Sequence, residues 1–405
     1  MNKKILIVTP NVLIPTRGAC EQDRMEGILQ LKRLGFDVQV LGKIFSFQSK
    51  ENIEAFSKVH EVPFHVVPYR YNEPRNLFQN FFYYFKRLIH PSYWDGSVYE
   101  YADPSMCERM EEVLQAWKPD IVWFDYTFML PLYRLARRHG SKIITHSLIY
   151  DPKNILEEEG RTLKNYIRAG LKTITDIISI KRSDYFFAIA PDEKRMYERL
   201  GAKKIALLPL RALYHLLGKN KDIRDRSVLN VFFLGSSYHI KHNLGAAAFI
   251  INEIVPRVQK LYQNKFRFFI TGGKLPEDLE QKCSKQGISY VGFVENLDSF
   301  LADMDIALIP SLFGTGMQQK IFEPLTRGFP TITSTRGLGD YPFETEKEIL
   351  AAETADEFVA QLGRLLDVEK RRAISSAALE KSKHFFSREV SDRTVKTAIA
   401  AVVRQ

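Results

Sequence analysis

The residues best suited to chemistry lie in one short segment, Leu312–Ser334. Its sequence is LFGTGMQQKIFEPLTRGFPTITS. Gly314 and Gly316 form a turn before a helix, and the free backbone N–H groups at a helix start attract anionic or strongly polar groups. Lys320 and Glu323 stand three residues apart and therefore share one face of that helix. A lysine there suits a phosphate, and a carboxylate accepts a pair of hydroxyls such as those of a ribose.

A strand, a turn, a helix and a second strand position these residues. The apolar run Ala302–Pro310 predicts a buried parallel strand before the turn. Residues Gln318–Arg327 predict the helix, and Gly328 followed by Pro330 predicts its end. The next strand is predicted over Phe329–Ser334.

The same alternation of strands and helices runs along the whole chain in two blocks. It implies parallel sheets joined by right-handed crossovers. A polar stretch, Gly218–Ser227, separates the blocks, and 405 residues suit two domains. We predict one Rossmann-like domain over 1–215, a second over 216–385, and a terminal helix within 386–405.

Composition excludes several classes of protein. The chain is 45% hydrophobic and 26% charged, as expected for a globular protein. Cys20, Cys107 and Cys283 are far apart, which favours a reducing compartment and argues against a disulfide framework or a zinc site. The first apolar run is too short for a signal peptide, and no run approaches the ~20 residues of a membrane span. We therefore expect a cytoplasmic protein without a metal site.

One stretch carries a family resemblance. Residues Glu323–Pro330 resemble the nucleotide-binding helix of family 4 glycosyltransferases, which reads Glu-Ala-x-Ala-x-Gly-x-Pro before a strand. Many members have another acidic residue eight positions earlier, where this chain has Thr315. A subset instead carries Gly-x-Gly-x-x-x-Lys-x-x-Glu. The matching residues here are Gly314, Gly316, Lys320 and Glu323.

The resemblance implies the GT-B fold, in which two Rossmann-like, doubly wound parallel-sheet domains face each other across a cleft. It also implies that the last helix crosses back to the first domain. In such a protein Glu323 holds the nucleotide ribose, and the backbone around Gly316 and Met317 approaches the donor sugar or phosphate. The departure at Thr315 affects the contact with the donor sugar.

The first strand-to-helix turn of the second domain is also similar to the family. Members often have Gly-Arg there and a lysine six residues after the glycine. Gly235 and Lys241 match, whereas Ser236 replaces the arginine. The resemblance implies that Lys241 meets the donor diphosphate, and a lysine at a helix start suits that role. The alternative is a solvated surface lysine.

In the first domain, Gly18 opens a helix after the first strand and resembles the glycine loop that faces the donor in this family. Glycines at helix starts also serve packing. His146 ends a strand, where open α/β sheets place ligands, and family members often have a histidine near here that contacts the donor sugar. A structural histidine is an equally ordinary interpretation. Asp125 and Tyr126 end the neighbouring strand and are candidates for acceptor binding.

Other classes compete with a transferase. A dehydrogenase is disfavoured because no G-x-G-x-x-G follows the first strand, and a P-loop NTPase because its Gly-Lys-Ser/Thr signature is missing. A non-catalytic sugar-nucleotide-binding subunit stays open because of Thr315 and Ser236. A GT-B epimerase or phosphorylase shares the fold but not the clustered match.

We predict a retaining glycosyltransferase that moves a sugar from a nucleoside-diphosphate donor to a glycan, a lipid-linked or another hydroxyl acceptor. The nucleotide sugar is its co-substrate, and no cofactor or metal is expected. The predicted residues are His146, Lys241 and Glu323 for catalysis; Gly18, Gly235, Ser236, Gly314, Thr315, Gly316, Met317 and Lys320 for the donor; and Asp125 and Tyr126 for the acceptor.

The net charge of +10 has several explanations. It can reflect a solvated basic surface, a polyanionic ligand such as a nucleotide sugar, or contact with an anionic membrane face. Nucleic acid is disfavoured because the basic residues are dispersed. The aromatic segment Asn76–Tyr101 allows acceptor binding or a peripheral contact with the inner membrane face, but aromatic runs favour helices packed on the first domain.

Overall fold

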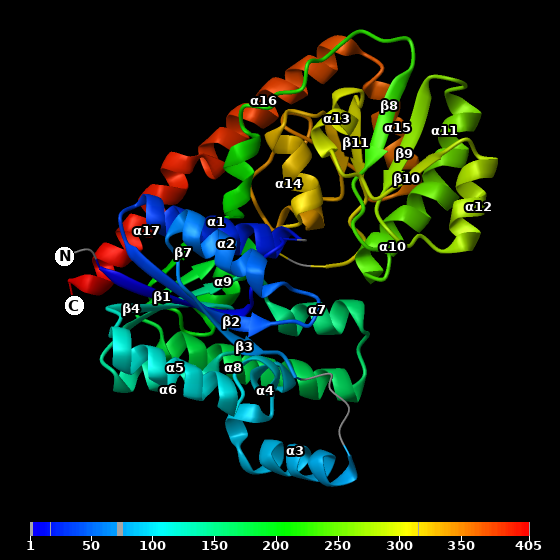
Figure 1. The fold of residues 1–405 in the computed structure, drawn as a ribbon. Coiled ribbons are helices and arrows are strands. Elements are labelled where there is room, and N and C mark those ends of the chain that lie inside the picture. The colour runs from blue at the N-terminus through cyan, green and yellow to red at the C-terminus, as the bar shows by residue number, and fades with distance from the viewer. Residues whose placement is uncertain (1–2, 17, 71–75, 315, 405) are drawn as a thin grey trace. The chain divides into compact units, whose positions relative to one another are not determined.

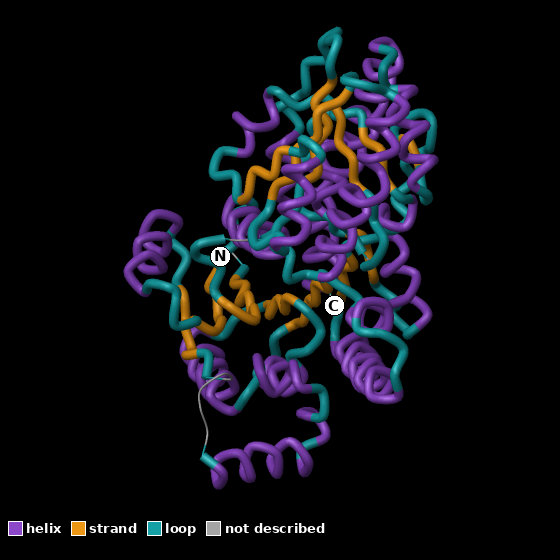
Figure 2. Tube along the Cα trace, turned by 90° about the vertical axis from the view of Figure 1, so that its right-hand side faces the viewer, coloured by secondary structure: helices purple, strands orange, loops and turns teal. Residues whose placement is uncertain are grey.

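The chain forms two compact α/β units. The computed structural model describes residues 3–16, 18–70, 76–314 and 316–404. The first unit contains the residues up to Ala212 together with those from Ser391 on, and the second contains Leu213–Val390. Figures 1 and 2 show a central sheet with helices on both faces in each unit.

The sheet of the first unit has seven strands among the described residues. They are β1 (Lys4–Asn11), β2 (Asp37–Ile44), β3 (Phe64–Pro68), β4 (Ile121–Asp125), β5 (Lys142–Ser147), β6 (Tyr185–Ala188) and β7 (Ile205–Leu207). Their order is β3-β2-β1-β4-β5-β6-β7, and neighbouring strands are parallel.

Helices and helical turns connect these strands. They are α1 (Ala19–Arg33), α2 (Lys50–His60), α3 (Leu77–Ile89), η1 (Pro91–Tyr93), α4 (Gly96–Tyr101), α5 (Pro104–Trp117), α6 (Leu130–Arg138), α7 (Asp151–Glu158), α8 (Leu163–Arg182), α9 (Pro191–Arg199) and, at the end of the chain, α17 (Arg388–Val403).

Alternate residues of β1 face two different cores, because successive side chains of a strand point to opposite faces. Ile5 and Ile7 belong to the core that α1 and α17 cover. Leu6 and Val8 belong to the core that α5 and α6 cover. Burial on both faces explains why the strand is an unbroken apolar run.

The second unit repeats this design with six strands among the described residues. The strands are β8 (Leu229–Phe233), β9 (Phe266–Thr271), β10 (Ser289–Gly292), β11 (Ile306–Ile309), β12 (Thr331–Thr333) and β13 (Leu350–Ala351). Their order is β10-β9-β8-β11-β12-β13, again with parallel neighbours. The predicted fold class, two doubly wound parallel sheets, is confirmed.

The helical segments of the second unit lie between these strands and after the last one. They are α10 (Lys241–Phe249), the π-helical turn η3 (Ile250–Ile254), α11 (Val255–Leu261), α12 (Glu277–Lys285), α13 (Leu297–Ala302), α14 (Gln319–Thr326), η4 (Thr335–Leu338), α15 (Ala355–Arg364) and α16 (Val368–Phe386).

The division between the units falls inside the 3-10 helix η2 (Arg211–Leu216). The polar stretch that we expected at the boundary, Gly218–Ser227, begins a few residues later and lies within the second unit. There the Lys221 amide donates to the Arg327 carbonyl at 2.7 Å, and Arg371 donates to the Arg224 carbonyl at 2.9 Å. Backbone groups therefore hold this stretch, although its sequence is polar.

Several elements differ from the sequence prediction. The helix after β8 begins at Lys241 and is interrupted by the π-helical turn η3 just before Pro256, which has no N–H to donate. The aromatic segment folds into helices, as expected, but the large apolar side chains that the structure describes in α3 are exposed, so packing on the first unit does not explain them. Across the described residues, every helix is too short or too polar to span a lipid bilayer.

Candidate functional site

Both sheets have a point where the order of strands reverses. In the first unit it lies between β1 and β4, and in the second between β8 and β11. Open α/β sheets bind ligands beside the carboxyl ends of the strands at such points, because the following loops diverge there. Most of the predicted site residues follow these four strands or lie close to them.

In the second unit, the turn after β8 is tightly packed around Gly235. A Cβ on Gly235 would lie 2.3 Å from the Tyr238 hydroxyl and 2.4 Å from the Thr271 carbonyl oxygen, so only glycine fits. The next residue, Ser236, accepts a 2.8 Å hydrogen bond from the side-chain amide of Asn243. Asn243 is buried near the start of α10.

The same asparagine connects this turn to α14. Its Oδ1 accepts a hydrogen bond from Nζ of Lys320 at 3.2 Å. The lysine ammonium also lies 5.7 Å from the centre of the Phe233 ring, at the end of β8. The structure therefore brings two predicted donor residues, Ser236 and Lys320, together through Asn243, which the sequence analysis missed.

The glycine turn before α14 needs both of its glycines. Gly314 has a φ of 91° and Gly316 a φ of 71°, in the left-handed region that favours glycine. Ser311 holds the turn closed by donating to Oε1 of Gln318 at 3.1 Å. Met317, also predicted to approach the donor, is buried. Thr315 lies outside the described residues.

Glu323 has partners of its own on α14. Its Oε1 accepts from Nη2 of Arg327 at 3.1 Å, and its Oε2 accepts from the Gln319 side chain at 3.2 Å. Arg327 also donates to Asp298 at 2.8 Å. Lys320 and Glu323 thus contact different partners, although they share one helix. Lys241 is an exposed first residue of α10.

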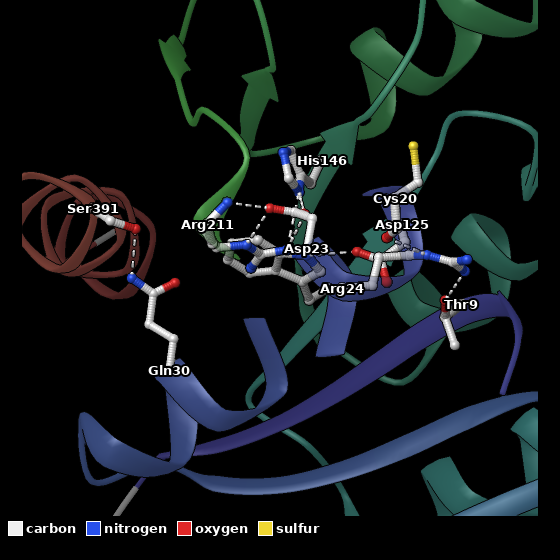
Figure 3. Close-up of polar contacts among 10 residues, drawn as sticks. Thr9, Cys20, Asp23, Arg24, Gln30, Asp125, His146, Arg211 and Ser391 are labelled. Atoms are coloured by element: carbon white, nitrogen blue, oxygen red, sulfur yellow. Dashed lines mark hydrogen bonds and ion pairs between the residues drawn. The ribbon is translucent and has the colours of Figure 1, made fainter. Parts of the chain in front are cut away.

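In the first unit, the candidate site is a buried ion pair beside a histidine (Figure 3). Arg211 donates to the carboxylate of Asp23 through Nε at 3.1 Å and Nη2 at 2.7 Å, and also through its backbone amide. Nη2 lies 3.4 Å from Nδ1 of His146. All three side chains are almost completely buried. The pair fixes the histidine from one side.

The charges decide the proton on His146. Burial, and then the charge of Arg211, lower the pKa of His146 to about 3, so the ring is neutral at neutral pH. A guanidinium can only donate, hence Nδ1 is the acceptor and the ring proton lies on Nε2. Among the described residues, Nε2 makes no hydrogen bond of ordinary geometry, although a contact between the ring and the Leu208 backbone opposes part of the fall in the pKa. A neutral N–H of this kind suits a sugar hydroxyl or phosphate oxygen.

Asp23 and Arg211 sustain each other's charge. Burial alone would raise the pKa of Asp23, but Arg211 outweighs it and the pKa is lowered. Gly27, one turn further along α1, makes room for the pair, because a Cβ there would lie 2.0 Å from Nη1 of Arg211. Gln30 continues the same polar face of α1 and donates to Ser391 of α17 at 2.8 Å (Figure 3).

The predicted acceptor residues lie beside this pair. Asp125 and His146 face each other in the register of β4 and β5. The amide of Tyr126 donates to the His146 carbonyl at 2.8 Å, and Tyr126 itself has a φ of 69°, which a bulky residue rarely adopts. Burial raises the pKa of Asp125 to about 6, against the opposing charges of Arg24 and Arg211.

Arg24 links α1 to the end of β1. It donates to Thr9 at 2.7 Å and to Asn11 at 3.1 Å, and its guanidinium lies 5.5 Å from the centre of the Tyr126 ring. Gly18 precedes this turn of α1 with an extended backbone and open space around its Cα. The structure therefore places Gly18 near the cluster but shows no steric need for glycine.

Five residues of these clusters were not predicted from the sequence: Asp23, Arg24, Arg211, Asn243 and Arg327. One signal was available for the first of them. Asp23, Gly27 and Gln30 are spaced so that they share one face of α1, and that face is buried. Buried polar side chains need hydrogen-bond partners, so a partner for Asp23 could have been expected. Among the described residues, no group of three or more His, Cys, Asp or Glu side chains is placed to hold a metal ion.

The second unit matches a known protein family. Residues 229–368 match the model of the family described as Glycosyl transferases group 1. This stretch contains Gly235, Asn243, Lys320 and Glu323. A sequence comparison with curated proteins found no match.

Solved structures share the whole fold. Sucrose-phosphate synthase from Thermosynechococcus elongatus aligns with a TM-score of 0.70 at 12% identity, over 100% of both chains. Anabaena HepE in complex with UDP and glucose aligns with a TM-score of 0.63 at 14% identity, over 98% of this chain and 100% of that one. A Listeria monocytogenes protein named as a candidate UDP-N-acetylglucosamine 2-epimerase aligns with a TM-score of 0.59 at 11% identity, over 98% of this chain and 96% of that one.

At such low identities the structural matches show only the fold. The match to the family model indicates the class of protein, a glycosyltransferase. The second unit matches the glycosyl transferases group 1 family over residues 229–368. The predicted class of protein, a glycosyltransferase enzyme with the GT-B fold, is confirmed.

Proposed function

We propose that the protein transfers a sugar from a nucleoside-diphosphate donor to a hydroxyl acceptor with retention of configuration. The observation that carries this proposal is the Ser236–Asn243–Lys320 hydrogen-bond chain. It joins the turn after β8 to the helix after β11, at the point where the strand order of the matched unit reverses. Diphosphate oxygens fit there, since a lysine, side-chain donors and helix starts converge on one edge.

In this proposal Lys320 neutralises the diphosphate, and Lys241, at the start of α10, adds a second positive charge. Holding the leaving diphosphate with fixed cations and backbone dipoles stabilises the charge that develops as the sugar departs. Gly235, Gly314, Gly316 and the Met317 backbone allow close approach of the donor. Glu323 accepts the ribose hydroxyls through its less occupied oxygen, Oε2.

The first unit supplies groups for the sugar and the acceptor. The Nε2–H of His146 donates to a hydroxyl of the donor sugar, while Asp23 and Arg211 keep the ring neutral and oriented. Asp125 and Tyr126 lie on the adjacent strand end and are assigned to the acceptor. The acceptor class that we propose is a glycan or a lipid-linked precursor, met at the inner membrane face. The donor is a co-substrate, and no resident cofactor or metal is required.

Incubation with a panel of nucleotide sugars tests this function. We expect one donor to give slow hydrolysis alone and faster release of nucleoside diphosphate with an acceptor, with the anomeric configuration of the product retained by NMR. Turnover should survive a chelator. A second candidate, a sugar-nucleotide-binding subunit without activity, is favoured by Ser236 in place of the family's arginine. Tight binding of a donor without any hydrolysis or transfer would support that subunit and contradict the enzyme.

A further inference from the structure

One helix of the first unit has its polarity reversed. In α3, eight large apolar side chains are between 44% and 90% exposed: Leu77, Phe78, Phe81, Phe82, Tyr84, Phe85, Leu88 and Ile89. At 100° per residue they form one broad stripe along the helix. A surface helix normally turns such a stripe to the core, so this orientation needs a reason.

Two polar side chains of α3 face the protein instead. Asn80 and Arg87, seven residues apart, share the opposite side of the helix and are half-buried. Nε of Arg87 donates to the Tyr93 carbonyl at 3.3 Å, and its guanidinium packs against Gly96. Both figures place α3 as the outermost helix of the first unit (Figures 1 and 2).

The exposed rings contact one another rather than the core. Phe78 and Phe82 lie 4.7 Å apart, and Phe81 and Phe85 stack at 6.0 Å. Trp94 extends the stripe beyond the last turn of α3, where its indole N–H donates to the Leu88 carbonyl at 3.0 Å, and it is 49% exposed. Phenylalanine with tyrosine and tryptophan is the composition that partitions into the boundary between lipid headgroups and acyl chains.

A groove of about 410 Å³ begins where α3 ends. Its lining includes Ile89, His90, Tyr93, Leu130, Arg134 and Arg182, and no carboxylate is among the described lining residues. In the described part of the chain, Arg134 has no hydrogen-bond or ion-pair partner. Burial, and then the like charge of Arg134, lower the pKa of Arg182, which shows that the two guanidinium groups act on each other. Two neighbouring arginines with apolar walls fit a phosphate that carries apolar chains.

We propose that α3 and Trp94 lie in the interface of an anionic phospholipid bilayer, with a lipid phosphate held by Arg134 and Arg182. A helix satisfies its own backbone hydrogen bonds, so one side of it can enter lipid without cost to the fold. The net charge of +10 attracts an anionic surface. A second copy of this chain is a poorer occupant, because it would bring the same arginines and the same net charge against each other.

Co-sedimentation of the whole protein with vesicles tests the proposal in the absence of any nucleotide. Vesicles of phosphatidylcholine alone are compared with equal mixtures of phosphatidylcholine and phosphatidylglycerol, at low and high salt. Wild type should bind the anionic vesicles more tightly, and salt should weaken that binding. The triple variant Phe81→Ser/Phe85→Ser/Leu88→Ser should lose at least about tenfold in affinity, because it removes three exposed apolar side chains that the proposal places in the lipid.

Three exposed apolar residues elsewhere give a matched control, Val59→Ser/Leu261→Ser/Phe293→Ser, which should bind as wild type does. Arg134→Gln/Arg182→Gln should bind anionic vesicles more weakly than wild type does, with a smaller salt dependence, and should bind neutral vesicles as wild type does. Lys320→Met, a change in the donor region, should leave vesicle binding intact, so a failure here is separable from a failure of the proposed transfer. Unfolding temperatures establish that each variant folds.

The fluorescence of Trp94 provides a second measurement. Anionic vesicles should shift the emission to the blue, and the shift should be lost in Trp94→Phe. Equal binding of wild type and the triple α3 variant would overturn the proposal, as would equal binding to neutral and anionic vesicles. It would also fail if wild type were a dimer that ignores vesicles and the α3 variant were a monomer.

Discussion

The ligand edges of the two units are built in opposite ways. In the second unit the candidate groups lie on two loops and the helices that follow them, and Lys241 and Lys320 are exposed or half-buried. In the first unit the corresponding groups form a cluster that is almost fully buried, with an ion pair at its centre. The family match covers the former edge and not the latter. Local motifs therefore predict the edge that we propose for the donor, whereas the cluster of the first unit becomes visible only in the folded chain.

The largest difference between the edges should be in stability. Asp23→Asn removes the only charge partner that the described structure gives Arg211 within hydrogen-bond distance, and leaves a buried cation. We expect the free energy of unfolding to fall by about 3–5 kcal/mol. Glu369→Gln, which breaks an exposed pair with Arg372, should cause no resolvable change. Denaturant unfolding measures both, and equal effects would mean that the buried pair is not a stabilising element.

Gly235 in the second unit and Gly18 in the first unit should respond differently to the same substitution. Gly235→Ala forces a Cβ into the Tyr238 hydroxyl and the Thr271 carbonyl, so we expect a loss of about 1–3 kcal/mol of stability and weaker nucleotide binding. Gly18→Ala meets open space in an extended backbone, so the protein should be as stable as wild type. Thermal unfolding with and without nucleotide distinguishes them. A neutral Gly235→Ala would show that the turn after β8 can move away.

Glu323 tests whether the donor edge binds the nucleoside. Glu323→Gln should weaken nucleotide binding by roughly 1–3 kcal/mol, the scale of a hydrogen bond to a charged group. Asp298→Asn is the control, because it also removes a partner of Arg327 but lies on another helix. If calorimetry gives the same loss for both variants, Glu323 acts only by positioning Arg327.

The buried acids of the first unit predict a pH dependence. Burial raises the pKa of Glu193 to about 8, and that of Asp176 likewise to about 8. The folded protein then binds more protons than the unfolded chain above the ordinary pKa of a carboxyl group. Stability must therefore fall as pH rises toward 8, by at most about 1.4 kcal/mol per pH unit for each group.

Replacing one of these acids isolates its contribution to the pH dependence of stability. Glu193→Gln should make the slope of stability against pH shallower by about 1.4 kcal/mol per pH unit near pH 6, and by about half that near pH 8. Glu198→Gln, on the same helix with a much more exposed side chain, should leave the slope unchanged. A Glu193→Gln protein with the wild-type slope would show that Glu193 ionises normally.

Sequence alone located much of the fold because the elements carry local signals. Apolar runs such as Ile5–Val8 predict buried strands, and Asp103 with Pro104 marks the start of α5, where the Asp103 side chain does cap the helix. No local signal indicates which way the apolar side of α3 faces. Its stripe of apolar residues predicts an amphipathic helix, but periodicity does not say whether that stripe meets the core or the solvent.

The candidate site divides in the same way. The positions of glycines and lysines at turns and helix starts of the second unit were predictable, because such positions depend on neighbours a few residues away. Asp23 and Arg211 are 188 residues apart, and nothing local to either residue indicates that they pair. Asn243 was missed for a simpler reason: an asparagine near a helix start ordinarily serves as a cap, and its contact with Lys320 depends on the packing of α14 beside α10.

The central claim is that Lys320, connected to Ser236 through Asn243, binds the donor diphosphate. Titration calorimetry of Lys320→Met with a nucleoside diphosphate and with the matching nucleoside tests it most directly. Lys260→Met, at the end of α11 on the opposite edge of the sheet, is the control. The account predicts that Lys320→Met loses at least about tenfold in affinity for the diphosphate, about 1.4 kcal/mol, with the nucleoside unaffected. An equal loss for both ligands, or no loss for the diphosphate, would contradict it.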